Sequence, residues 1–65
     1  MNDDEKFFML QAMRHYGGGF VSALSEAWAR ADATNAARLA ASFPDITKDY
    51  GPGSAFYEAI KARSA

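Results

Sequence analysis

The chain has 65 residues, of which seven are Lys or Arg, eight are Asp or Glu and none is Cys. This length allows one domain at most and buries only about 60% of the surface that the unfolded chain exposes. The formal net charge of −1 excludes a strongly basic nucleic-acid binder, and the lack of cysteine excludes disulfides and thiolate metal sites.

The composition predicts helices rather than strands. Apolar residues make up 49% of the chain, and 14 of them are alanines, whereas Ile, Val and Thr together number only five. This balance favours helix. No apolar run approaches the roughly 18 residues of a membrane span, so we expect no membrane partner. The start, Asn2–Glu5, lacks the basic and apolar regions of a secretory signal, so we expect a cytoplasmic protein.

The first predicted helix covers residues 3–16. Asn2 is a suitable N-cap, and Glu5 follows it at the spacing of a capping box. The run Gly17-Gly18-Gly19 ends this helix. Because a left-handed cap commonly ends a helix and glycine adopts it without cost, we expect at least one of the three glycines to have a positive φ.

The second predicted helix covers residues 20–31 and is clearly amphipathic. At 100° per residue its apolar side chains share one arc, which consists of Phe20, Val21, Leu24, Ala27, Trp28 and Ala31. The other side carries Ser22, Ser25, Glu26, Ala29 and Arg30. We therefore expect Trp28 to lie in the core.

The rest of the chain predicts a third helix over residues 35–50, interrupted at Pro44, with Asp32 or Thr34 as its N-cap. A Gly-Pro-Gly turn follows, and Ser54 then caps a last helix over 55–63. The predicted fold class is all-α. It is a small bundle of three main helices plus a short C-terminal helix, in a single domain over residues 1–65.

The polar residues do not form a catalytic or metal-binding pattern. His15 has no nucleophile or orienting acid at a recognisable spacing, and it suits the last turn of its helix. The glycine run lacks the lysine of a phosphate-binding loop. Asp45 and Asp49 lie four residues apart but have no third ligand nearby in the sequence. We therefore expect no enzyme, no cofactor and no metal ion.

A second apolar stripe on the first helix is the main candidate for a binding surface. Phe7 and Leu10 lie outside the predicted buried face, with Arg14 between them. Either this helix is central and covered on both sides, or the stripe contacts another chain. Tyr50 and Tyr57 flank the Gly-Pro-Gly turn, and tyrosine is enriched at interfaces. We hypothesise that the stripe and one of these tyrosines bind a partner.

Part of the sequence resembles a group of short proteins encoded by bacteriophages and prophages. The similar segments are HYGGGFVSALSEAWARADATNAARL and FPDITKDY, which together cover a little over half of the chain. The resemblance implies a phage accessory protein. Small proteins of that kind often bind and block a host machine, as anti-CRISPR proteins do.

The expected function is therefore a non-enzymatic protein-binding module that inhibits a host defence complex, with that complex or a second copy as its partner. The alternative is a nucleic-acid-associated phage accessory factor. It requires the fold to gather dispersed basic residues, namely Arg14, Arg30, Arg38, Lys48, Lys61 and Arg63. Binding to phosphates weakens steeply with added salt, whereas an apolar protein contact changes little, so salt dependence separates the two.

Overall fold

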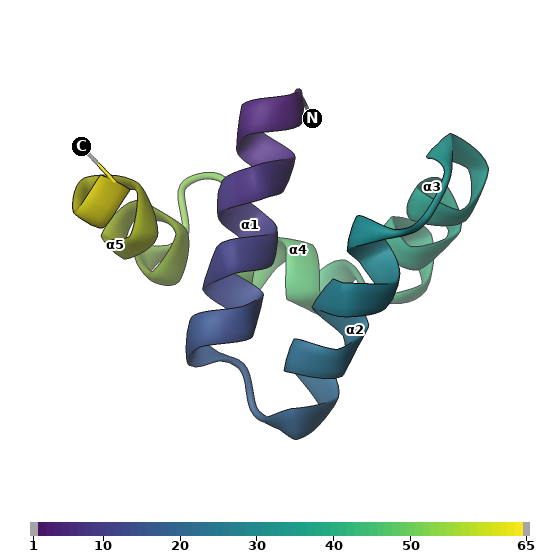
Figure 1. Cartoon of the computed structure of the whole chain (residues 1–65), viewed down its shortest axis with the longest axis horizontal. Helices are drawn as coiled ribbons and strands as arrows, with labels where there is room; N and C mark the ends of the chain where they lie inside the picture. The colour runs from purple at the N-terminus through teal and green to yellow at the C-terminus, as the bar shows by residue number, and fades with distance from the viewer. Residues whose placement is uncertain (1, 65) are drawn as a thin grey trace.

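The chain folds as five α-helices in a computed structural model that describes residues 2–64 (Figure 1). In chain order they are α1 (Asp3–Tyr16), α2 (Gly19–Ala29), α3 (Ala33–Ser42), α4 (Pro44–Tyr50) and α5 (Ala55–Ser64). The prediction of an all-helical fold is confirmed. The shortest helix is α4, with seven residues, whereas the C-terminal helix α5 has ten and equals α3 in length.

Helix α1 is the central element. It contacts α2, α4 and α5, whereas α3 contacts only α2 and α4. Figure 1 shows α5 and α3 on opposite sides of the molecule, with α1 and α2 between them. No helix among residues 2–64 is long and apolar enough to cross a membrane.

N-cap hydrogen bonds form at the starts of α1, α3 and α5, as the sequence predicts. The capping box of α1 is confirmed, because Glu5 N donates to Asn2 Oδ1 at 2.8 Å and Asn2 N donates to Glu5 Oε1 at 3.0 Å. Asp32 caps α3 by accepting a hydrogen bond from the backbone N–H of Asn35 at 2.8 Å. Ser54 Oγ accepts one from Tyr57 N at 3.2 Å at the start of α5. Each cap satisfies a backbone donor that the helix leaves free.

The prediction of a positive φ in the glycine run is wrong. Gly17 and Gly18 have φ of −75° and −74° with extended ψ, and Gly53 is the one residue of the described chain with a positive φ. Glycine is needed at position 17 for space instead. A Cβ there would collide with the carbonyl oxygen of Met13 and the side chain of Val21. The break between α1 and α2 nevertheless falls in this run.

The buried face of α2 is rotated relative to the predicted arc. Trp28 is buried as expected, but Ser25 is also fully buried, whereas Phe20 is 65% exposed. Ser25 is tolerated inside because its hydroxyl donates to the Ser22 carbonyl oxygen at 2.6 Å, so no polar group is left unsatisfied. The prediction that Ser25 lies on the polar side and Phe20 on the buried side is therefore wrong.

The predicted third helix is two helices. Its interruption at Pro44 is confirmed, because the chain breaks at Phe43, with φ −129° and ψ 65°, and α4 begins at Pro44. The core is a cluster of side chains from four helices: Met9, Met13, Trp28, Ile46 and Tyr57. Residues of α3 such as Leu39 pack against this cluster only partly, and no residue of α3 is fully buried.

Candidate functional site

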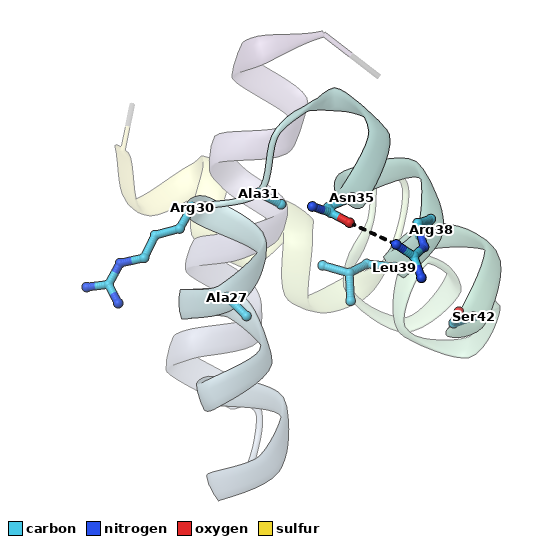
Figure 2. Close-up of a pocket in the computed structure, with 7 residues that line it drawn as sticks. All are labelled: Ala27, Arg30, Ala31, Asn35, Arg38, Leu39 and Ser42. Carbon is cyan, nitrogen blue, oxygen red and sulfur yellow. Dashed lines mark hydrogen bonds between the residues drawn. The ribbon is translucent and has the colours of Figure 1, made fainter.

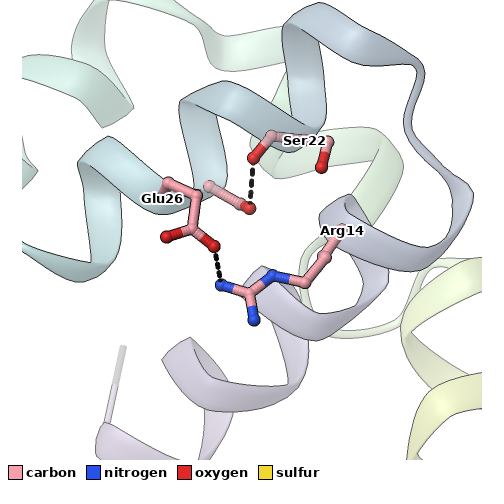
Figure 3. A network of polar contacts seen from close by, with 4 residues as sticks. Arg14, Ser22 and Glu26 are labelled. Atoms are coloured by element: carbon pink, nitrogen blue, oxygen red, sulfur yellow. Dashed lines mark hydrogen bonds and ion pairs between the residues drawn. The ribbon is translucent and has the colours of Figure 1, made fainter.

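The fold does not bring the predicted stripe of α1 together as one surface. Phe7 is 54% exposed, on the side of α1 that faces α5. Leu10 is half-buried and packs against the core. Arg14 turns toward α2, where its guanidinium forms an ion pair with Glu26 (Figure 3). Of the three residues, Phe7 is thus the one left as an exposed apolar contact.

Tyr57 does not belong to a binding surface in this fold. It is 5% exposed, and its ring meets the ring of Phe8 edge to face with 5.9 Å between centroids. Burial raises the pKa of its phenol above the usual value, and the negative charges of Glu5, Glu58 and Asp4 raise the pKa further. Tyr57 is a core residue, so the hypothesis that its side chain contacts a partner is wrong.

Tyr50 does take part in a partly exposed aromatic series. Its ring stacks on Phe56 at 5.4 Å and 21°, and Phe56 stacks in turn on Tyr16 at 4.6 Å and 16°. Tyr16 and Phe56 are 37% and 39% exposed, and Tyr50 is half-buried. The three rings come from the end of α1, the start of α5 and the end of α4. The fold thus brings Tyr16 beside two rings that lie 34 and 40 residues further along the chain.

A pocket adjoins this series between α1 and α5. Its volume is about 280 Å³, and its lining residues are Phe7, Gln11, His15, Ile60 and Arg63. His15 links the pocket to the series, because its ring packs edge to face on Tyr16 at 4.6 Å while its Nε2 lies 2.8 Å from Arg63 Nη1. A guanidinium only donates, so His15 Nε2 accepts this hydrogen bond.

We call the group of Phe7, His15, Tyr16, Tyr50 and Phe56 the aromatic surface. Three of its members, His15, Tyr16 and Phe56, are not among the residues that the sequence predicts to bind a partner. One signal was present. Tyr16 and Tyr50 each end a helix directly before a glycine, and such positions lie at the edge of a bundle.

The charged residues are distributed over several sides of the molecule. Arg14 is neutralised by Glu26, Arg63 lies beside His15, and Arg30 and Arg38 line a groove between α2 and α3. Asp45 and Asp49 are exposed on α4. Within residues 2–64 there is no group of three or more His, Cys, Asp or Glu placed to hold a metal ion.

Comparisons with protein-family models, with curated proteins and with solved structures found no match to this chain.

Proposed function

We propose that this protein is a small non-enzymatic binding module that recognises another protein through the aromatic surface. The observation that carries the proposal is the stacked series of Tyr16, Phe56 and Tyr50, in which Tyr16 is 37% and Phe56 39% exposed. Aromatic side chains bury the most apolar area per residue at interfaces, and tyrosine and arginine are enriched among the residues that dominate binding energy.

The stacking also prepares the aromatic surface for binding. Each ring of the series is held by a neighbour from a different helix, at centroid distances of 4.6 and 5.4 Å. Side chains that are already ordered lose less conformational entropy when a partner covers them. Phe7, at 54% exposure, extends the apolar area on the other side of His15.

The proposed partner is a host protein complex, and the proposed action is inhibition of a host defence system in the host cytoplasm, as anti-CRISPR proteins do. Support for this setting comes from the resemblance of residues 15–50 to short phage-encoded proteins. A second copy of the chain is the other candidate partner. It is distinguished by measuring the mass of the particle in solution as a function of protein concentration.

The test is a comparison of partners captured from a bacterial host lysate. The double variant Phe7→Ser with Tyr16→Ser removes exposed rings from the aromatic surface. Phe20→Ser is the matched control, because Phe20 is the most exposed phenylalanine and lies on α2, away from this surface. We expect the parent and the control to retain the same protein and the double variant to lose it, while all three stay folded by circular dichroism.

Retention of the same protein by the folded double variant would refute the proposal. A steep loss of binding between low and high salt, together with recovery of nucleic acid, would favour the alternative of a nucleic-acid-associated factor. An apolar contact through the aromatic surface is expected to change little over that range.

A further inference from the structure

A second hollow lies between α2 and α3, on the side of the molecule away from α5 (Figures 1 and 2). We call it the α2–α3 groove. Its volume is about 500 Å³, and its lining residues are Ala27, Arg30, Ala31, Asn35, Arg38, Leu39 and Ser42. This volume is within the range of pockets that bind ligands in proteins.

The floor of the groove is apolar because α2 has more apolar surface than α1 covers. Trp28 turns into the core, but Ala27 and Ala31, from the same predicted arc, point into the groove (Figure 2). Leu39 of α3 faces them from the other side. Since no residue of α3 is fully buried, α3 forms one wall of the groove without filling it.

One basic side chain, that of Arg38, borders the groove, and none of the lining residues is an acid. Arg38 Nη1 donates to Asn35 Oδ1 at 3.3 Å, which holds the guanidinium beside Leu39, whereas the Arg30 side chain extends away from the groove (Figure 2). Within residues 2–64, Arg14 forms an ion pair with Glu26, whereas neither Arg30 nor Arg38 forms an ion pair.

We propose that the α2–α3 groove binds an acidic, amphipathic helical segment of another protein. Apolar side chains of that segment cover Ala27 and Ala31 and pack against Leu39, and a carboxylate pairs with Arg38. A groove between two helices with a floor of small apolar side chains suits a helix that inserts its apolar face. The Arg38 guanidinium favours an acidic residue beside that face, by charge complementarity.

A protein segment fits this groove better than a nucleic-acid backbone does. Tracking phosphates requires several cations along one path. Here one guanidinium, that of Arg38, lies over an apolar floor, and the whole chain has a net charge of −1. The proposal does not depend on the aromatic surface, because α3 contacts only α2 and α4, and α5 lies on the opposite side.

The experiment selects peptides from a displayed library of random 16-residue sequences on the full chain. The blocking variant is Ala27→Glu, which places a carboxylate on the exposed floor of the groove. The control is Ala23→Glu, with the same charge change at an exposed position of α2 outside the groove. Arg38→Gln tests the cation, and Lys48→Gln, at an exposed position of α4, is its control.

We expect the selected peptides to be acidic, with apolar residues three and four positions apart. Arg38→Gln should weaken their binding about tenfold or more, as the loss of a charge-assisted hydrogen bond does. Ala27→Glu should weaken it at least as much, because its carboxylate occupies the floor and repels an acidic peptide. Ala23→Glu, Lys48→Gln and the double variant of the aromatic surface should leave the affinity unchanged. That last result separates a failure of the groove from a failure of the aromatic surface.

Three results would overturn the proposal. The first is a failed or unselective selection. Either no peptide is enriched, or the enriched peptides are neutral or basic, or they bind the Ala27→Glu variant as tightly as the parent protein. The second is that a 20-nucleotide DNA competes for the groove with a steep salt dependence, which would assign it to phosphates. The third is concentration-dependent self-association that Ala27→Glu abolishes, which would make a second copy the occupant.

Discussion

At the scale of single residues, two small residues occupy places where the packing leaves little room. Gly17 lies where a Cβ would meet the Met13 carbonyl oxygen and Val21. Ser25 is fully buried on α2, with its hydroxyl bonded to the Ser22 carbonyl oxygen. Gly17 does not accommodate a Cβ unless Met13 or Val21 moves. Close approach is what seals Met9 and Met13 in the core.

Substitution of Gly17 by Ala should destabilise the protein, because the new methyl group has to displace backbone or the Val21 side chain. The expected loss is about 1–3 kcal/mol in the free energy of unfolding, as for other overpacked sites. Gly18→Ala is the matched control. It has a φ of −74° and nothing within 4 Å of the added Cβ, so it should be neutral or slightly stabilising. Equal denaturation midpoints for the two variants would contradict the steric argument.

Tyr57 should make the stability of the protein decline at alkaline pH. Its phenol pKa is raised by burial and then by Glu5, Glu58 and Asp4. The unfolded chain therefore releases this proton at a pKa of about 10, before the folded chain does. The contribution is complete below about pH 10 and is lost as the pH rises through the folded pKa.

Thermal melts between about pH 9 and 11 test this effect. We expect Tyr57→Phe to show a shallower decline of melting temperature with pH than the parent does. Tyr16→Phe controls for the removal of a phenol at a partly exposed position. A parallel decline in the parent and Tyr57→Phe would remove Tyr57 as the cause.

At the scale of elements, α3 is the helix least supported by the core. It contacts α2 and α4 but not α1, and none of its residues is fully buried. Its N-terminus is stabilised locally by Asp32, and its C-terminus ends at the break before Pro44. In contrast, α1 buries Met9, Ala12 and Met13 completely and contacts three other helices.

Hydrogen exchange should show this difference. Because local opening requires less free energy where few apolar contacts are lost, we expect the backbone amides in the middle of α3 to exchange faster than those around Met9 and Met13 in α1. Asp32→Ala should increase exchange in α3 further without affecting α1, since the cap acts on its own helix. Uniform protection in α1 and α3 would mean that the chain opens only as one unit.

At the scale of the whole molecule, stability depends on very few residues. The core cluster has five buried members, and nine partly buried apolar side chains pack against it. A core in a chain of this length contributes roughly 3–5 kcal/mol of net stability. Trp28 is the largest side chain in that cluster and is contributed by α2.

Replacement of Trp28 by Ala should therefore remove most of the stability. The expected cost is about 3–5 kcal/mol, the usual range for deleting a buried aromatic side chain. Trp28→Phe should cost less, because it keeps a ring in the same site. Denaturant unfolding followed by circular dichroism measures both. If Trp28→Ala melts within a few degrees of the parent, the core is organised around other residues.

The predicted end of the second helix at residue 31 is wrong, because α2 ends at Ala29, and α3 begins at Ala33 rather than at residue 35. The sequence by itself determined the start of α1 and the break before α4, and it limited the N-cap of α3 to Asp32 or Thr34. The relevant interactions are local, between residues three or four positions apart, so they can be identified without a fold. Asn2 with Glu5, Asp32 with Asn35, and the break before Pro44 are all of this kind. The burial of Trp28 was predictable for a similar reason, because it is a large apolar residue within a wide apolar arc.

Only the tertiary structure decided which side of each helix is covered. A period of 100° per residue relates side chains on one helix to each other, but it contains no information about the neighbouring helices. Ser25 is inside and Phe20 outside, although the apolar arc of α2 predicts the reverse. Tyr16, Tyr50 and Phe56 stack because the end of α1 meets the turn between α4 and α5 in space. The aromatic surface is therefore a property of packing between elements, which no spacing within one element encodes.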